Sequence, residues 1–190
     1  QAAFTRNTLG GAAVATQTLA GPRKVVAFTP RSFAPYDGED GSAQGLEMEI
    51  PRPSVKVIEK RNKSGDAVDI QAAERLVIVG QGVENQSDMD LVEKIAKALD
   101  AEIACSKPVA SDKKWLSEDR VVGLSGKICK PALALILGVS GQVQFTVGVR
   151  EAQVIISINN DENAFINKMS DYNLQADLKE ALPELWKALQ

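Results

Sequence analysis

The stretch KPALALILGVSGQVQ, residues 130–144, sets the pattern for the second half of the chain. Its apolar run 133–137 predicts a buried strand, and the segment from Gly138 to Gly141 predicts a tight turn after it. The same order recurs at 76–79 before Gly80-Gln81-Gly82, at 103–105 before a Ser-Lys-Pro turn, and at 154–158 before Asn159-Asn160-Asp161. Apolar strands separated by helices are typical of a parallel sheet covered on both faces. We therefore predict a Rossmann-like α/β domain over residues 72–190.

Two amphipathic helices are predicted in this domain. Ser87 is expected to open the first, whose apolar face would carry Leu91, Ile95, Ala98 and Leu99. The last helix would pack on the sheet and has Pro183 in its first turn, where proline is tolerated. Its apolar face holds Leu182, Leu185, Trp186 and Leu189.

Residues 1–71 differ from the rest of the chain. Segments 24–29 and 55–59 are predicted strands, and they flank a stretch from Pro30 to Gly45 that is rich in Gly, Pro, Ser and Asp. The segment lacks the apolar residues for a core of its own. We interpret it as a β-rich remnant next to the α/β domain.

Composition narrows the functional classes. The net charge of -3 reflects 25 acidic and 22 basic residues with no basic block, which argues against nucleic acid as a partner. The longest apolar run, from Pro131 to Val139, is too short for a bilayer, which needs about 20 residues. No signal for export is recognised. Cys105 and Cys129 are interpreted as buried thiols in a reducing cytoplasm or organelle matrix.

Candidate ligand contacts lie in the turns that follow the strands. In an open parallel sheet, ligands bind beyond the carboxyl ends of the strands, near the N-termini of helices. The segment from Gly138 to Gln144 would let a pyrophosphate approach the backbone, or would be a tight turn with Ser140 as an N-cap. The glycine turns at 80–82 and 123–126 are weaker candidates of the same kind.

Each of three side chains near these turns could either contact a ligand or have a purely structural or solvated role. Asn159 and Asp177 each follow a predicted strand and could reach an adenosine, although Asp177 could equally be an N-cap. Lys107 could place a positive charge near an electron-rich ring or be an ordinary solvated lysine.

Catalytic machinery is not recognised in the sequence. The chain has no histidine, which removes the usual zinc sites and His-based nucleophile schemes. A paired-carboxylate site and a Walker-type loop are not found either. Redox chemistry would have to come from a cofactor.

Residues 130–144 resemble the signature of electron transfer flavoprotein alpha subunits, whose usual form is close to KPELYIAVGISGAIQH. The resemblance continues at INND, 158–161, which is similar to the family's INKD, and at SDYNLQADL, 170–178, which is similar to its ADYGIVADL. ACSKPV, 104–109, and KKW, 113–115, look most like the branch tied to carnitine metabolism and nitrogen fixation. The similarity extends from about residue 75 to the C-terminus.

The resemblance implies an FAD-binding electron carrier without substrate chemistry of its own. An alpha subunit of this family pairs with a beta subunit and passes electrons from a dehydrogenase to a quinone reductase or another acceptor. Residues 1–71 would be the closing strands of a shortened N-terminal domain and the crossover linker, so the chain alone is expected to bind FAD poorly. The location would be the bacterial cytoplasm or the mitochondrial matrix.

The family's cofactor contacts can be carried over by position. Gln81, Ser106, Lys107 and Ser125 would lie near the isoalloxazine ring. The stretch from Ser140 to Phe145 would lie near the flavin and its pyrophosphate. The adenosine would be contacted by Asn159, Asp177 and Leu178. The full set is Gln81, Ser106, Lys107, Gly123, Leu124, Ser125, Ser140, Gly141, Gln142, Val143, Gln144, Phe145, Asn159, Asp177 and Leu178.

Four of these positions depart from the family on the ring side. Gln81 and Lys107 replace arginines, Ser125 replaces a threonine and Phe145 replaces a histidine. Phe145 can supply neither a hydrogen bond nor a charge to a reduced, anionic ring. We therefore predict a lower first reduction potential than is usual for the family, or weak flavin binding.

Two other functions stay open. A nucleotide-binding module of this fold that has lost the flavin could hold AMP or nothing, and act as a structural or regulatory subunit. An NAD-dependent enzyme on a related sheet would need an acid-base group near the cofactor, for which the sequence offers no convincing candidate.

Overall fold

The computed structural model describes residues 3–9, 13–28, 32–34, 38, 41–42, 45, 47–49, 55–59 and 68–190. The chain divides into two compact units, one of Gln1–Val26 with Asp66–Gln190 and one of Ala27–Gly65. The predicted boundary between residues 71 and 72 stays a prediction. Among the described helices, none is long and apolar enough to cross a membrane.

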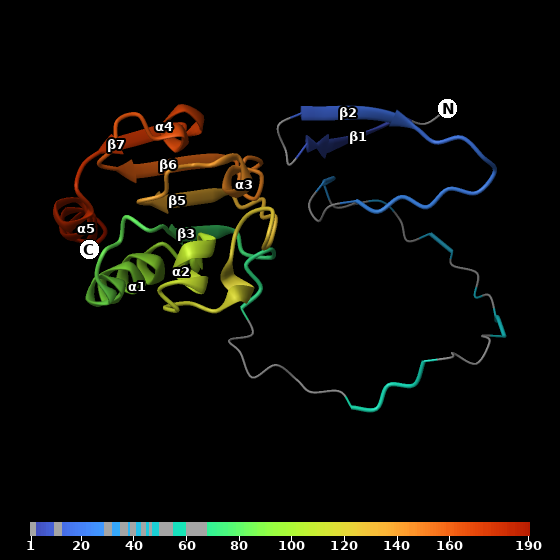
Figure 1. The fold of residues 1–190 in the computed structure, drawn as a ribbon, viewed down its shortest axis with the longest axis horizontal. Coiled ribbons are helices and arrows are strands. Elements are labelled where there is room, and N and C mark those ends of the chain that lie inside the picture. Colours follow the sequence, from blue (N-terminus) through green and yellow to red (C-terminus); the bar gives the residue numbers. More distant parts are fainter. Residues whose placement is uncertain are drawn as a thin grey trace. The chain divides into compact units, whose positions relative to one another are not determined.

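A five-stranded parallel sheet forms the centre of the second half of the chain (Figure 1). Its strands lie in the order β4-β3-β5-β6-β7, and each pairs in parallel with its neighbours. The α/β class is confirmed. Their bounds are β3 Arg75–Val79, β4 Glu102–Cys105, β5 Leu133–Leu137, β6 Val154–Asn159 and β7 Tyr172–Gln175.

The strand order reverses direction between β3 and β5. From β3 the chain moves outward to β4, and it then returns to the other side of β3 to build β5, β6 and β7. Such a reversal opens a crevice at the carboxyl ends of the two strands, because their following connections leave toward opposite faces of the sheet. The turns after β3 and β5 meet at this point.

Alternate residues of the central strands enter two separate cores. Val77, Val79, Leu135 and Leu137 pack on one face with buried residues of α1, α2 and α5. Leu76, Ile78, Ala134 and Ile136 pack on the other face with Phe145 of α3 and Ile166 of α4. Burial on both faces explains why these strands read as continuous apolar runs. The helix bounds are α1 Met89–Ala98, α2 Lys107–Ser111, α3 Val143–Thr146, α4 Phe165–Met169 and α5 Leu178–Ala188.

Helix α1 begins later than predicted and buries a different stripe. Ser87 lies in a 3₁₀ turn, Gln86–Asp88, whose N-cap is Asn85, and α1 follows from Met89. The buried residues are Met89, Val92, Ile95 and Ala96. The expected face shares only Ile95 with this stripe: Leu91 and Leu99 pack at its edge, and Ala98 is exposed.

Helix α5 packs against the core as predicted, but the expected position of Pro183 is wrong. Leu182 is buried, and Leu185, Trp186 and Leu189 are partly buried against the same core. The helix starts at Leu178, so Pro183 lies in its interior. Pro183 is exposed, and its missing N–H removes one intrahelical bond.

The described part of the N-terminal region contains an antiparallel hairpin, β1 Ala3–Thr8 and β2 Ala13–Thr18. The strands predicted at 24–29 and 55–59 are wrong: residues 24–28 and 55–59 are in no strand, and residue 29 lies outside the described part. An apolar, β-branched run becomes a strand only where a partner satisfies its backbone groups. β1 and β2 supply partners for each other, in register from Ala3 with Thr18 to Thr8 with Ala13.

Candidate functional site

A cavity of about 740 Å³ opens at the carboxyl ends of β3, β4, β5 and β6. It lies at the reversal between β3 and β5, where ligands of doubly wound sheets bind. Its walls come from the turns after these strands, from α3 and from the loop around Leu124. The lining residues are Gln81, Gly82, Ser106, Lys107, Pro108, Ser111, Val122, Leu124, Ser125, Gly138, Val139, Ser140, Gln142, Gln144, Phe145, Asn159, Asp161 and Ala164.

Backbone packed against backbone builds the wall between β3 and β5. The N–H of Gly80 donates to the Leu137 carbonyl at 2.8 Å, and the N–H of Gly82 donates to the Gly138 carbonyl at 2.9 Å. A Cβ added at Gly80 would lie 2.2 Å from the Gly138 oxygen, and one at Gly82 would lie 2.8 Å from the Gly138 Cα. We call Gly80, Gly82 and Gly138 the glycine wall. These glycines are needed first for the contact between the two turns.

The turn after β5 leads into a very short helix. Helix α3 spans Val143–Thr146, and its N-cap is Gln142. The alternative that Ser140 is an N-cap is therefore wrong: Ser140 is exposed and lines the cavity, while its carbonyl accepts from the Ile166 N–H at 3.2 Å. One helical turn gives only weak dipole support to an anion, so hydrogen-bond donors at this wall matter more.

Two N-cap side chains face the cavity and leave their helices uncapped. Ser106 precedes α2 and Gln142 precedes α3, and neither side chain makes a cap hydrogen bond. Ser106 is 8% exposed. Because serine at this position usually bonds to the first turn of its helix, its hydroxyl is here available to a ligand. Lys107, the next residue, is exposed and also lines the cavity.

Asn159 braces the turns after β5 and β6. Its Nδ2 donates to the Val139 carbonyl at 2.8 Å, and its Oδ1 accepts from the Asp161 N–H at 3.0 Å. It is 7% exposed and lines the cavity. The Asn159 amide therefore fixes the two turns at the base of the cavity, and its second Nδ2 hydrogen can bond to a ligand.

The turn at 123–126 closes the cavity on the side of α3. The N–H of Leu124 donates to the Gln144 carbonyl at 2.7 Å. Gly123 has φ of 127°, and a Cβ there would lie 2.5 Å from that same oxygen. The turn follows isolated bridges at Val121 and Val122 instead of a full strand. Leu124 and Ser125 thus reach the cavity from a loop that is tied to α3.

Phe145 belongs to an apolar part of the wall. It is 8% exposed and packs in the core beneath α3 with Val122, Val139 and Ala164. All four line the cavity. The resemblance predicts a histidine at this position, whereas the Phe145 ring has no hydrogen-bond donor.

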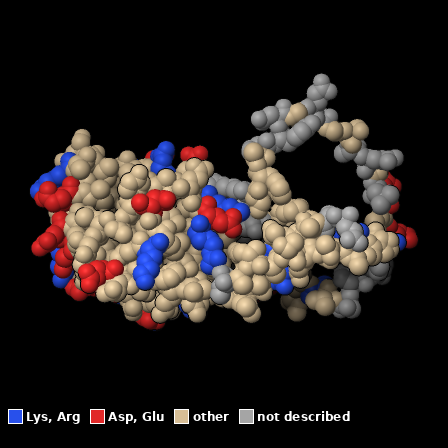
Figure 2. All heavy atoms as spheres, turned by 90° about the horizontal axis from the view of Figure 1, so that it is seen from above, with Lys and Arg blue, Asp and Glu red and all other residues tan. Residues whose placement is uncertain are grey.

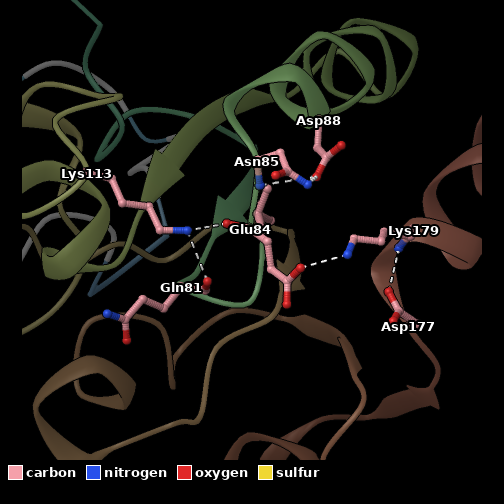
Figure 3. Close-up of polar contacts among 8 residues, drawn as sticks. Gln81, Glu84, Asn85, Asp88, Lys113, Asp177 and Lys179 are labelled. Atoms are coloured by element: carbon pink, nitrogen blue, oxygen red, sulfur yellow. Dashed lines mark hydrogen bonds and ion pairs between the residues drawn. The ribbon is translucent and has the colours of Figure 1, made fainter.

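Asp177 and Leu178 lie outside this cavity. They line a separate hollow of about 30 Å³, which shares Gly82 and Gly138 with the larger cavity. The Asp177 Oδ1 accepts from the Lys179 N–H at 2.8 Å, so Asp177 is the N-cap of α5. Figure 3 shows this cap beside the ion pair of Lys179 with Glu84, whose atoms are 2.7 Å apart.

The structure gathers most of the predicted contacts. Those that line the cavity are Gln81, Ser106, Lys107, Leu124, Ser125, Ser140, Gln142, Gln144, Phe145 and Asn159. Those that do not line it are Gly123, Gly141, Val143, Asp177 and Leu178. Eight further residues line the cavity outside the set carried over from the family: Gly82, Pro108, Ser111, Val122, Gly138, Val139, Asp161 and Ala164.

Some of the missed residues could have been found. Gly82, Gly138 and Val139 stand inside the turns already singled out, so their position after a strand was a sufficient indication. Asp161 and Ala164 follow β6 at a greater distance in the sequence. Their place depends on how that loop bends back, which the pattern does not show.

The burial of the two cysteines and the distribution of charged side chains agree with what the sequence predicts. Cys105 and Cys129 are buried and form no disulfide, as predicted. Burial raises the pKa of Cys105 to about 12, while the nearby Arg120 charge acts in the opposite direction. On the face shown in Figure 2, basic and acidic side chains of the described residues are interspersed.

Known proteins identify the domain that carries this cavity. A family model described as the electron transfer flavoprotein FAD-binding domain matches residues 69–150. Protein FixB of Salmonella paratyphi A is 33% identical over 192 residues, which cover 100% of this chain and 61% of that protein. Protein FixB of Escherichia coli O127:H6 is 34% identical over 183 residues, 95% of this chain and 58% of that protein.

These matches agree with the residues that carry the resemblance. The chain spans about three fifths of the length of its FixB relatives, 61% and 58% in these two cases. The family model covers β3, β4, β5 and α3, and thus most of the cavity wall. Residues 69–150 therefore form an electron transfer flavoprotein FAD-binding domain, and the chain is homologous to FixB proteins.

Proposed function

We propose that the cavity binds FAD and that the chain acts as the electron-carrying part of an alpha subunit. The observation that carries this proposal is the position of the cavity: it lies at the β3–β5 reversal and is lined by the turns that match the family. A related fold alone would not be enough, since one fold serves many functions. The family match and the chemistry of the wall together support flavin.

The residues present fit such a cofactor. Ligand pockets commonly measure about 300–1,000 Å³, so a cavity of about 740 Å³ is large enough for most of a dinucleotide. Ser140, which is exposed in the turn after β5, offers a hydroxyl donor to a diphosphate. The apolar wall around Phe145 suits an aromatic ring, and serine and glutamine side chains surround it with hydrogen-bonding groups.

Each group of residues has a proposed task. Gln81, Ser106, Lys107 and Ser125 would hold the ring end, and Ser140 to Phe145 would hold the flavin and its pyrophosphate. Asn159, Asp177 and Leu178 would contact the adenosine end, which requires the ligand to extend from the larger cavity into the smaller hollow. Gly82 and Gly138 border both the cavity and the hollow, so the ligand would have to pass over them.

The bound flavin would supply the redox chemistry, accepting and releasing electrons one at a time. The protein's residues would set how easily this happens. The Lys107 charge favours a reduced, negatively charged ring, whereas Phe145 offers no donor for it. The apolar wall keeps water away from that side of the cavity.

Phe145→His tests this reasoning directly. A histidine at this place would donate a hydrogen bond, or a charge, to the reduced ring and so raise the first reduction potential. One charged hydrogen bond of about 1.5 kcal/mol corresponds to roughly 60 mV for a one-electron couple. An anaerobic potentiometric titration of both proteins measures the difference. A potential that does not rise would contradict the proposed place of Phe145 beside the ring.

Partners follow from the same proposal. We propose a heterodimer with an electron transfer flavoprotein beta subunit, a dehydrogenase as donor, and a quinone reductase or another oxidoreductase as acceptor. Residues 1–71 would be the closing strands of an N-terminal domain and the crossover linker. The bacterial relatives favour the bacterial cytoplasm over the mitochondrial matrix.

A second function is favoured by Phe145 alone. A nucleotide-binding module that has lost flavin would have no need for a donor at this position, and an apolar ring would be tolerated there. Such a module would serve as a structural or regulatory subunit. AMP would then bind while FAD would not.

An absorbance spectrum with FAD titration decides between these functions. It is recorded for the 190-residue chain and again after a beta subunit and the further N-terminal residues of a FixB relative are added. Stoichiometric flavin bands in either sample support the electron carrier. Their absence from both samples would overturn it, whether or not AMP binds.

A further inference from the structure

Lys113 stands just after α2, and its ammonium reaches across to the turn after β3. Its Nζ donates to the Gln81 carbonyl at 3.1 Å and also to the Val83 carbonyl. The ring of Trp115 lies beside the same ammonium, with 4.2 Å between Nζ and the ring centroid. Two carbonyl oxygens and an aromatic face thus surround the charge, an arrangement that suits a fixed ammonium.

The backbone of Lys113 is itself anchored to α2. Its N–H donates to the Pro108 carbonyl at 3.1 Å, and the N–H of Trp115 donates to the Val109 carbonyl at 3.2 Å. Trp115 also packs against the core on the α1 side of the sheet. Lys113 therefore links the wall that follows β4 to the wall that follows β3.

One peptide group in the β3 turn is held at both ends. The Gln81 carbonyl accepts from Lys113, and the N–H of Gly82, which belongs to the same peptide unit, donates to Gly138 at 2.9 Å. A peptide unit is planar and rigid, so fixing both groups fixes its orientation. Figure 3 shows the Gln81 carbonyl facing the ammonium while the Gln81 side chain points away from it. That side chain lines the cavity.

We propose that Lys113 is a positioning residue of the cofactor cavity: it clamps the Gln81–Gly82 peptide against Gly138 and thereby keeps the Gln81 amide on the cavity wall. This inference rests on the proposed function, because the amide would then face the flavin ring. Lys113 itself does not line the cavity. Its effect on the cofactor would therefore be transmitted through the turn.

The test compares Lys113→Met with Lys114→Met in the 190-residue chain. Methionine keeps most of the length of lysine and removes its charge and donors. Lys114 is exposed and is the next residue, so the same change there serves as the control. Circular dichroism and thermal unfolding show that each variant is folded. If Lys113→Met fails to fold, Lys113→Gln, which keeps an N–H donor but no charge, takes its place.

The first readout needs no flavin. Amide hydrogen exchange of Gly82 is expected to speed up by about tenfold or more in Lys113→Met, because the peptide loses a charge-assisted partner. In Lys114→Met it should stay unchanged. Equal exchange rates in the two variants would overturn the clamp, whatever the ligand is.

The second readout uses FAD. Lys113→Met is expected to raise the Kd for FAD by about tenfold and to shift the visible absorption band of the bound flavin, since an untethered Gln81 no longer meets the ring in one geometry. Faster exchange with an unchanged Kd and spectrum would overturn the positioning role. If FAD binds neither to the unsubstituted chain nor to its complex with a beta subunit and the further N-terminal residues of a FixB relative, the proposed function is overturned, while exchange at Gly82 would still decide the clamp.

Discussion

The glycine wall lies among the residues that the family model matches, whereas the start of α5 lies beyond them, and the two regions are built differently. The wall consists of backbone against backbone, with a Gly80 Cβ position only 2.2 Å from the Gly138 oxygen. The start of α5 consists of side chains, in which Asp177 caps the helix and Lys179 pairs with Glu84. The first region faces the large cavity, and the second faces a much smaller hollow.

This difference teaches what a matched position can and cannot mean. A residue that follows a strand in a family motif can serve the ligand, the fold, or both. At the glycine wall, the fold already demands the residue. At the start of α5, we expect substitution to leave the fold intact, so a role in binding can be measured there separately from folding.

Gly80→Ala is expected to have the largest effect. The new methyl group would overlap the Gly138 carbonyl, so one of the two hydrogen-bonded turns would have to shift. We expect a loss of about 3 kcal/mol or more in the free energy of unfolding, or no folded protein at all. Denaturant titration measures it.

Gly41→Ala is the matched control, because a Cβ there meets no atom within 4 Å. It should change the free energy of unfolding by less than about 0.5 kcal/mol. Similar values for the two variants would show that the glycine wall is less tightly packed than the distances indicate.

The second largest effect is a dependence of stability on pH, which comes from Cys105 at the end of β4. Burial raises the pKa of Cys105, at the end of β4, to about 12 from an ordinary value of 9.0. The stabilisation of the native state is complete below pH 9 and is lost as the pH rises toward 12, because the unfolded chain gives up the thiol proton first. The slope is about 1.4 kcal/mol per pH unit.

Urea titrations at pH 8 and pH 10 of the native chain and of Cys105→Ala measure this slope. The variant should lose less stability over that interval by about 1.4 kcal/mol, although its absolute stability is lower. Parallel losses in the two proteins would mean that the thiol is not shielded from water. The start of α5, which is mostly exposed, should show no comparable dependence on a buried group.

The sequence predicts the sheet better than the elements at its borders. β5, Leu133–Leu137, matches the predicted run residue for residue, because burial on both faces leaves a continuous apolar signature. β7, Tyr172–Gln175, is exposed throughout and carries no such signature, so its bounds were not predicted. The start of α1 was missed because Asn85 and a 3₁₀ turn precede it, and both leave Ser87 outside the helix.

In the candidate site, too, the positions next to buried strands were easier to predict than the others. Turns that directly follow buried strands were placed correctly, because parallel strands bring their carboxyl ends to one edge. Asp177 lies outside the large cavity, beside the ion pair of Lys179 with Glu84, which joins segments that are distant in the sequence. Strand patterns contain no information on such contacts. The contact of Lys113 with the backbone carbonyls of the β3 turn could not be predicted for the same reason.

Asp177→Ala is expected to have a smaller effect than either change near the wall. Loss of the Oδ1 bond to the Lys179 N–H removes the N-cap of α5 and costs about 1 kcal/mol. Asp177→Asn keeps a capping oxygen and should retain nearly all the stability. If both variants bind FAD equally well, Asp177 serves the helix only. A weaker affinity in both would support its proposed contact with the adenosine.

The smallest effect is expected from the ion pair between Lys179 and Glu84. Their atoms are 2.7 Å apart, but both side chains are largely exposed, so water and salt screen the attraction. The hydrogen bond to Glu84, and then its charge, raise the pKa of Lys179. The pair therefore contributes below the ordinary pKa of lysine and is lost as the pH rises through the raised value.

A double-mutant cycle with Lys179→Met and Glu84→Gln isolates this pair. At low salt we expect a small favourable coupling, which disappears at high salt because the Debye length falls to about 3 Å at 1 M. The thermal midpoint should change less than in Asp177→Ala. A coupling that survives high salt would mean that the pair is shielded from solvent, and the start of α5 would then resemble the glycine wall more than its exposure suggests.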